Sequence, residues 1–203
     1  MEVIRGLINI KERHKGAVIT VGNFDGVHTG HRTILLEMKR KAAALQTKTL
    51  LICFEPQPRE FFDFYNAPAR LTRFKEKVEL LEELGIDMVL CLKFDESFRE
   101  TTAERFIEIL GKDLAVQAVY VGDDSRFGQG RTGNFGQLEA ASQRYGFKVF
   151  NFETIVYGED RVSSTRIREC LNAGDFDMAE QLLGHPYFIT GKVIYGRQIG
   201  RTL

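Results

Sequence analysis

The chain has 203 residues, 43% of them hydrophobic, and its 28 Lys and Arg residues balance 28 Asp and Glu residues, so the formal net charge is zero. The zero net charge argues against a nucleic-acid-binding protein, and the hydrophobic content argues against an intrinsically disordered one. Three widely spaced cysteines argue against a disulfide scaffold or a zinc knuckle. Because no apolar run approaches the ~18 residues of a membrane span and no signal peptide is recognisable, we expect a cytoplasmic protein with no membrane partner.

Apolar runs predict five strands, at residues 17–21, 47–54, 87–93, 116–121 and 147–152. Amphipathic patterns between and after them predict helices at about residues 30–45, 72–84, 101–110, 134–145, 164–171 and 175–183. Thr72 is expected to cap the second of these helices, and Thr101 and Glu104 to form a capping box on the third. The alternation predicts an α/β fold, an open Rossmann-like parallel sheet with helices on both faces.

Two segments do not follow this alternation. Residues 55–70 hold three prolines and four aromatic residues, which is typical either of a functional loop or of aromatic side chains that fold back as a satellite core. Residues 188–195 have the pattern of a further strand, but no partner strand follows. We therefore expect the chain to stop inside a second module.

Ligands of open parallel sheets bind beyond the carboxyl ends of the strands. The first such loop carries the motif GNFDGVHTGH at residues 22–31, directly before a helix. Its glycines allow a phosphate to approach the backbone closely, and the helix N-terminus offers free N–H groups. His28 and His31 project from one side of this turn and can donate hydrogen bonds to phosphate oxygens. A metal site would need further ligands that the spacing does not provide, and two helix-capping histidines are the simplest alternative.

A second motif, VSSTRIR, occupies residues 162–168 just after the fifth strand. The hydroxyls of Ser164 and Thr165 can cap a helix and can also contact phosphate. Arg168 lies one turn into that helix, where a guanidinium group can hold phosphate oxygens in a fork. A helix cap alone would look much the same, but the motif lies at the same sheet edge as the histidines.

A third stretch, GQGRTG at residues 128–133, matches the dinucleotide-binding pattern G-x-G-x-x-G. It does not directly follow the preceding strand, as that pattern requires, so we do not interpret it as an NAD site. The chain also lacks the G-x-x-x-x-G-K-[ST] pattern of P-loop nucleotide-binding proteins.

Together the histidine motif and VSSTRIR resemble the nucleotidyltransferase superfamily. Further motifs make the chain similar to the prokaryotic bifunctional riboflavin kinase/FAD synthetase family over essentially its whole length. These motifs are FEPQP at 54–58, RLT at 70–72, VGDD and RFG between 121 and 128, and LGHPY at 183–187.

The resemblance implies two parts. Residues 1–184 would be the FMN adenylyltransferase domain, and residues 185–203 the first residues of a truncated riboflavin kinase β-barrel. GKV at 191–193 and the final GRQIGRTL resemble the opening of that barrel, but the family's next motif, GFPTAN, is missing. The resemblance thus implies that this chain does not phosphorylate riboflavin by itself.

The resemblance also implies the reaction FMN + ATP giving FAD and pyrophosphate, with Mg²⁺ accompanying ATP. The family's catalytic positions match His28, His31 and Arg168. Its ATP-binding positions match Gly22, Phe24, Gly30, Ser164 and Thr165. Its FMN-binding positions are expected at Phe54, Pro56, Pro58, Asp124, Arg126 and Phe127. The metal ligands stay unassigned; Asp25 is a candidate, although an Asp in a tight turn as often bonds to its own backbone.

The chain departs from the family at one position near the flavin residues. Ser125 stands where the family usually has Phe. If that Phe packs on the flavin ring, FMN should bind more weakly here; if it packs in the loop, Ser125 lowers stability instead. Two other functions stay open: a sister nucleotidyltransferase with a different phosphate acceptor, and a non-catalytic flavin or nucleotide carrier.

Overall fold

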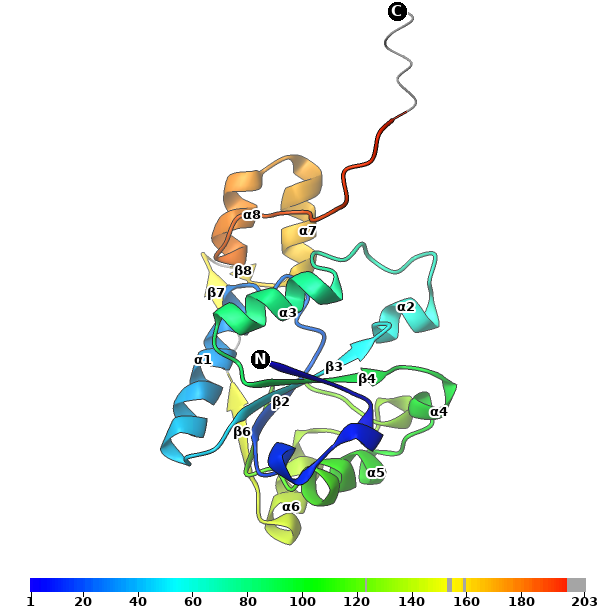
Figure 1. The fold of residues 1–203 in the computed structure, drawn as a ribbon, viewed down its shortest axis with the longest axis vertical. Coiled ribbons are helices and arrows are strands. Elements are labelled where there is room, and N and C mark those ends of the chain that lie inside the picture. Colours follow the sequence, from blue (N-terminus) through cyan, green and yellow to red (C-terminus); the bar gives the residue numbers. More distant parts are fainter. Residues whose placement is uncertain (123, 153–154, 159, 197–203) are drawn as a thin grey trace, which may run out of the picture.

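The computed structural model describes residues 1–122, 124–152, 155–158 and 160–196, shown as a ribbon in Figure 1. Its main feature is a six-stranded sheet of order β1-β4-β3-β2-β5-β6 in which every neighbouring pair is parallel. The strands are β1 (Glu2–Arg5), β2 (Val18–Val21), β3 (Thr49–Glu55), β4 (Met88–Lys93), β5 (Ala118–Gly122) and β6 (Lys148–Phe152). The predicted open parallel α/β sheet is confirmed.

The strand β1 was not predicted, because polar residues interrupt the apolar pattern of the N-terminal stretch. Only Ile4 of its four residues is buried, and Ile4 pairs with Leu90 of β4. An edge strand has a neighbour on one side only, so the flanking Glu2 and Arg5 can stay at the surface. The pattern of this half-exposed edge strand is therefore weaker than that of the four strands inside the sheet.

Helices cover both faces of the sheet (Figure 1). On one face α1 (Thr29–Ala44) and α3 (Phe74–Glu83) enclose one hydrophobic cluster. On the other face α5 (Ala103–Glu108), the helical turn η3 (Ile109–Asp113) and α6 (Phe135–Tyr145) enclose a second cluster. Because both faces are covered, the central strands are apolar throughout, which is the pattern that predicted them.

Smaller elements gather around the carboxyl ends of the strands. The helices α7 (Ser164–Ala173) and α8 (Phe176–Leu183) pack together in a third cluster. The remaining elements are η1 (Leu7–Asn9), η2 (Glu12–His14), α2 (Pro58–Phe62), α4 (Glu96–Arg99), η4 (Gln129–Arg131) and the antiparallel pair β7 (Val156–Tyr157) and β8 (Asp160–Arg161). No helix among the described residues is long and apolar enough to span a membrane.

Two predicted helix starts are wrong by one residue. Arg73, not Thr72, is the N-cap of α3, and the Thr72 hydroxyl instead accepts a hydrogen bond from Gly26 N at 3.0 Å. Thr102, not Thr101, caps α5 by accepting from Arg105 N, so the expected capping box does not form. At the start of α3 the Glu76 carboxylate accepts from Arg73 N at 2.7 Å, and at the start of α5 the second of two adjacent threonines is the cap.

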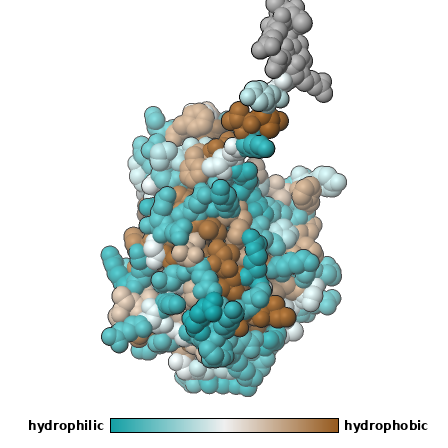
Figure 2. Space-filling view, in the orientation of Figure 1, coloured by the Kyte–Doolittle hydropathy of each residue, from teal (hydrophilic) through white to brown (hydrophobic). Residues whose placement is uncertain are grey.

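The predicted strand at residues 188–195 is also wrong: the segment 185–196 contains neither helix nor strand. A strand without a neighbour cannot pair its backbone N–H and C=O groups, so the alternating pattern alone does not form one. Figure 2 shows hydrophobic side chains where this segment leaves the domain, and Val193 and Tyr195 are almost fully exposed. The end of the expected barrel segment, residues 197–203, lies outside the described residues.

The segment 55–70 folds back on the domain in part, as the satellite-core alternative predicts, while its functional alternative stays a prediction. Arg70 holds it in shape through hydrogen-bonded ion pairs with Glu55 and Glu60, at 2.8 and 2.5 Å. The rings of Phe61 and Phe62 pack edge-on against a single ring of the β4–α4 connection, as a satellite core would. Phe64 and Tyr65, further along the segment, are exposed. The sequence could not separate these aromatic residues because all four lie in one polar-flanked run.

Candidate functional site

The topological switch point lies between β2 and β5. The chain first lays β3 and β4 on one side of β2 and then returns to place β5 on its other side. Loops that leave neighbouring strands in opposite directions open a crevice at this point, which is where open α/β sheets bind ligands. The turn after β2, residues 22–28, and the loop after β5 lie at this crevice, as predicted.

The turn after β2 stacks its two histidines at the start of α1. His28 is the N-cap of α1, and its Nδ1 accepts a hydrogen bond from His31 N at 3.3 Å. The two rings are stacked with centroids 3.5 Å apart, and the Phe24 ring lies 4.6 Å from that of His31. A Cβ atom at Gly30 would lie 3.3 Å from the His28 ring, so a glycine at this position leaves room for the His28 ring to stack on that of His31. Phe24 has a φ of 48°, a strained conformation for a bulky residue, and such strain gathers at functional sites.

Both histidines are neutral at pH 7. Burial, helped by the positive charge of Arg161, lowers the pKa of His28 to about 4. Burial also holds the pKa of His31 well below its usual range; a proton on His28, and the charges of Lys77 and Arg161, lower it too. Because His28 Nδ1 accepts a hydrogen bond, the proton of the neutral ring sits on Nε2. That nitrogen can donate to an anion at the start of α1.

This depressed pKa predicts how stability depends on pH. His28 is 6% exposed, and its pKa is about 4 in the folded chain against 6.5 ordinarily. Between these two pH values the unfolded chain binds more protons than the folded chain. The free energy of unfolding is therefore highest, as far as His28 is concerned, above pH 6.5, and it decreases by about 3 kcal/mol as the pH falls towards 4. Urea unfolding at several pH values between 4.5 and 7.5 measures this loss. His28→Asn, which keeps a capping side chain without an ionisable ring, should show a smaller loss, and an equal loss in both proteins would contradict the prediction.

Arg168 and Asp25 form a buried ion pair behind the turn. The Arg168 guanidinium donates to the Asp25 carboxylate and, at 2.6 Å, to Ala69 O. The same carboxylate accepts hydrogen bonds from Leu71 N and Thr72 N. The Asp25 side chain is therefore engaged by backbone groups and a cation, which leaves it poorly placed to hold a metal ion. Arg168, expected to face phosphate, holds the turn to α7.

The three hydroxyl groups of the VSSTRIR motif have different surroundings. Ser163 is the N-cap of α7 and accepts a hydrogen bond from Arg166 N. The Ser164 hydroxyl donates to Asp25 O at 2.9 Å, which joins α7 to the turn after β2. Thr165 is exposed on the first turn of α7. The structure thus brings both motifs together, as their place at one sheet edge predicted.

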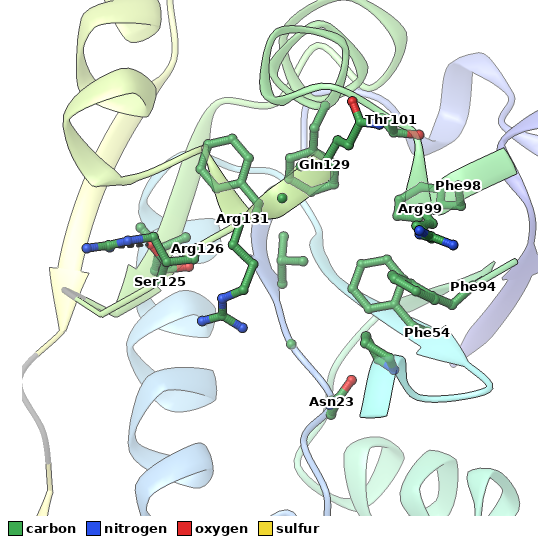
Figure 3. A pocket seen from close by; sticks show the side chains of 18 of the residues that line it. Asn23, Phe54, Phe94, Phe98, Arg99, Thr101, Ser125, Arg126, Gln129 and Arg131 are labelled. Atoms are coloured by element: carbon green, nitrogen blue, oxygen red, sulfur yellow. Dashed lines mark hydrogen bonds between the residues drawn. The ribbon is translucent and has the colours of Figure 1, made fainter. Parts of the chain in front are cut away.

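A cavity of about 770 Å³ opens beside the histidine turn (Figure 3). Phe54, Phe94 and Phe98 lie along one side of it, and Ser125, Arg126 and Arg131 on the other. Gly22 and Asn23 of the turn after β2 belong to its wall, so the cavity and the turn are continuous. A large apolar pocket with a few polar groups at its rim is typical of a small-molecule site.

Four of the six residues expected at the flavin line this cavity: Phe54, Pro58, Arg126 and Phe127. Pro56 and Asp124 do not; Pro56 is exposed, and Asp124 pairs with Arg161 of β8 at 3.1 Å. Sequence reasoning missed Asn23, Arg99, Gln129 and Arg131. The last two lie in the glycine-rich stretch that was set aside as a false dinucleotide motif.

That stretch has a packing reason for its first glycine. Gly128 has a φ of 73°, and a Cβ atom there would lie 2.6 Å from Ala103 N. Gln129 N donates to Thr101 O at 2.7 Å, which fixes the loop against the start of α5. The glycines therefore form a cavity wall, and their presence in the loop after β5 is the signal that could have placed Gln129 and Arg131 at the site.

Among the described residues no group of three or more His, Cys, Asp or Glu side chains is arranged to hold a metal ion. With the Asp25 carboxylate engaged as described, the described part of the turn offers no cluster of oxygen ligands of the kind that Mg²⁺ prefers. The site instead offers neutral imidazoles and backbone N–H groups at the start of α1, which suit an anion.

Comparisons with known proteins identify the family of the chain. The sequence model of the FAD synthetase family matches residues 10–166. Proteins described as bifunctional riboflavin kinase/FMN adenylyltransferase from Escherichia coli K12 and Haemophilus influenzae are 44% and 46% identical over 205 and 204 residues. Each match covers 100% of this chain and 66% of the relative, so the chain spans just under two thirds of their length.

A crystal structure of a macrolide-efflux protein from Streptococcus pneumoniae superimposes with a TM-score of 0.77. The superposition covers 92% of this chain and 72% of the other, at 21% sequence identity. This likeness concerns the fold, and it extends over nearly the whole chain.

Proposed function

The chain belongs to the FAD synthetase family, and on this premise we propose that it is an FMN adenylyltransferase, which transfers the adenylyl group of ATP to FMN and releases pyrophosphate. The observation that carries the proposal is the continuity of two sites. An aromatic-lined cavity of about 770 Å³ adjoins a helix N-terminus with two stacked neutral imidazoles. A flat apolar ring suits the first, and phosphates suit the second.

In this reaction an oxygen of the FMN phosphate attacks the α-phosphorus of ATP in line. A new P–O bond forms, the bond between the α-phosphorus and the bridging oxygen breaks, and the electron pair leaves with pyrophosphate. The protein has to hold two anions together and stabilise the charge that develops on the phosphates. We propose that His28 Nε2 and the His31 ring donate hydrogen bonds to these oxygens, and that Gly22, Phe24 and Gly30 shape the nucleotide pocket.

We propose further roles for the residues around the turn. Ser164 and Thr165 would contact ATP from the start of α7, and Arg168 would act partly through the turn that it anchors. Phe54, Pro58, Arg126 and Phe127 would enclose FMN, with Pro56 and Asp124 at the margin of the cavity. Mg²⁺ would arrive as the Mg–ATP complex, since metal ions commonly neutralise the oxygens of a nucleotide triphosphate.

We also propose that residues 1–184 form the adenylyl-transfer domain and that residues 185–203 lead into a riboflavin kinase module. The bifunctional names of the relatives and their greater length support this division. Within the described residues, the segment after α8 stays bound to the domain at two points. His185 Nε2 contacts Gly26 O at 3.0 Å, and Thr190 N donates to Glu76.

The direct test is FAD formation from FMN, ATP and Mg²⁺ by the purified chain. FAD and pyrophosphate should appear in equal amounts. A parallel screen with phosphopantetheine or glycerol phosphate as acceptor distinguishes a sister nucleotidyltransferase. Tight FMN binding without FAD formation under any of these conditions would favour a carrier and would contradict the proposal.

Ser125 provides a test of the cavity as the flavin site. Its side chain lines the cavity opposite the aromatic residues, so Ser125→Phe would add a ring there. An added aromatic contact contributes about 0.5–1.5 kcal/mol, so we expect KM for FMN to fall roughly two- to tenfold while KM for ATP stays the same. Steady-state kinetics with each substrate varied in turn measures both values. Ser125→Ala, which adds no ring, is the matched control, and a gain in stability without any change in KM for FMN would place the ring in the loop instead.

A further inference from the structure

Lys77 is a buried charged residue that the adenylyl-transfer proposal does not use. It lies on the second turn of α3 and is fully buried, with an exposed fraction of 0%. Its Nζ has no hydrogen-bond partner among the described residues. Lys39, on the neighbouring helix α1, instead donates to Leu84 O at 2.6 Å. Burying an ammonium group without a partner costs several kcal/mol, so folding alone gives no reason for a lysine at position 77.

The backbone places Lys77 directly behind the histidine turn. Gly26 N donates to the Thr72 hydroxyl at 3.0 Å, and Leu71 N and Thr72 N donate to the Asp25 carboxylate. The start of α3 is therefore joined to the turn after β2 by hydrogen bonds. The helices α1 and α3 pack in one cluster on the same face of the sheet (Figure 1). Lys77 follows Thr72 by five residues and its side chain is fully buried, so it lies in the interior close to this turn.

The electrostatics agree with this placement. The charge of Lys77 lowers the pKa of His31, which lies on the first turn of α1. It also acts in the same direction on Cys53, near the carboxyl end of β3. The N-terminal end of α3 carries its own positive dipole, which adds to the ammonium charge. The interior behind the turn therefore holds positive charge that nothing among the described residues balances by direct contact.

We propose that Lys77 is a positioning residue for the polyphosphate of the nucleotide: its buried ammonium supplies a fixed positive charge behind His31, which is balanced when phosphates bind at the turn of residues 22–31. In a protein interior a charge acts over longer distances than in water, so the ammonium attracts the phosphates without touching them. Lys77 thereby lowers stability in the free protein and strengthens binding of the anion. The identity of the nucleotide rests on the proposed function, but the effect requires only that a triphosphate bind at this turn.

The test compares Lys77→Met with Lys75→Met in the full chain. Lys75 is exposed on the same helix, so its substitution changes the net charge equally. We expect Lys77→Met to bind ATP about tenfold more weakly by calorimetric titration without FMN, and to unfold at the same or a higher temperature. Lys75→Met should match the wild type in both measurements. Lys77→Arg, which keeps the charge, should retain ATP binding within a few-fold.

Two results would overturn the inference. One is unchanged ATP affinity in Lys77→Met. The other is a lower unfolding temperature or failure of Lys77→Met to fold, which would make Lys77 a structural residue. FAD formation by the wild type is assayed separately. If the wild type makes no FAD but Lys77→Met binds ATP more weakly, the result supports this inference and contradicts the proposed function. If the wild type makes FAD but Lys77→Met binds ATP as tightly as the wild type, the result supports the proposed function and contradicts this inference.

Discussion

His28→Ala should lower kcat for FAD formation by about 10²–10³-fold with little change in KM for ATP. The neutral His28 ring is fixed by its stacking on His31 and by the hydrogen bond to its Nδ1, so Nε2 is a preorganised donor at the start of α1. Loss of one preorganised donor that acts mainly in the transition state typically has an effect of this size on kcat. Steady-state kinetics at saturating FMN, with ATP varied, measures both constants.

The matched control separates chemistry from helix capping, because His28 is also the N-cap of α1. Removal of the cap by Ala should lower the free energy of unfolding by about 1 kcal/mol. His28→Asn restores a good capping side chain that is too short to replace Nε2. We therefore expect His28→Asn to recover stability but not kcat. If kcat recovers together with the free energy of unfolding in His28→Asn, or if His28→Ala has the kcat of the wild type, His28 has no part in the reaction.

Arg168→Ala should destabilise the protein by about 3–5 kcal/mol, because it leaves a buried carboxylate without its cation. The Asp25 side chain is only 4% exposed, and that of Arg168 18%, so solvent screens this pair weakly. The variant also loses the hydrogen bond to Ala69 O, which joins α7 to the chain before α3. Urea unfolding monitored by circular dichroism measures the loss. An unfolding midpoint equal to that of the wild type would contradict the prediction.

A double-mutant cycle with Asp25→Asn then separates the structural role of Arg168 from a role at phosphate. Asp25→Asn combined with Arg168→Ala removes both charges, so we expect stability to return in part. If ATP affinity returns with it, Arg168 acts only by anchoring the turn. If KM for ATP and kcat stay impaired in the stable double variant, the guanidinium also reaches the nucleotide, as the family resemblance implies.

The sequence alone was sufficient for the main elements and for the place of the histidine turn. Apolar runs are clear in the four strands inside the sheet, which are covered on both faces, and all four were predicted. Of the two edge strands, β6 was predicted and β1 was not. The histidine turn could also be predicted, because its strand, glycines, histidines and helix are contiguous in the sequence. Predictions failed where one choice depends on distant residues. Thr72 is engaged by Gly26 and so does not cap α3, and in the part of the chain that the structure describes no strand pairs with residues 188–195.

By itself, then, the sequence determined the α/β class, the place of the histidine turn and the family, since these depend on local periodicity and local motifs. Only the tertiary structure decided which side chains meet. Asp25 and Arg168 are 143 residues apart in the chain, and the cavity draws its walls from separate loops after β2, β3, β4 and β5. It also decided that Lys77 lies inside the protein, whereas its helix neighbour Lys75 is exposed. The physical reason is that the burial of a side chain and its contacts with distant residues depend on how the whole chain packs, so a local sequence pattern does not predict them.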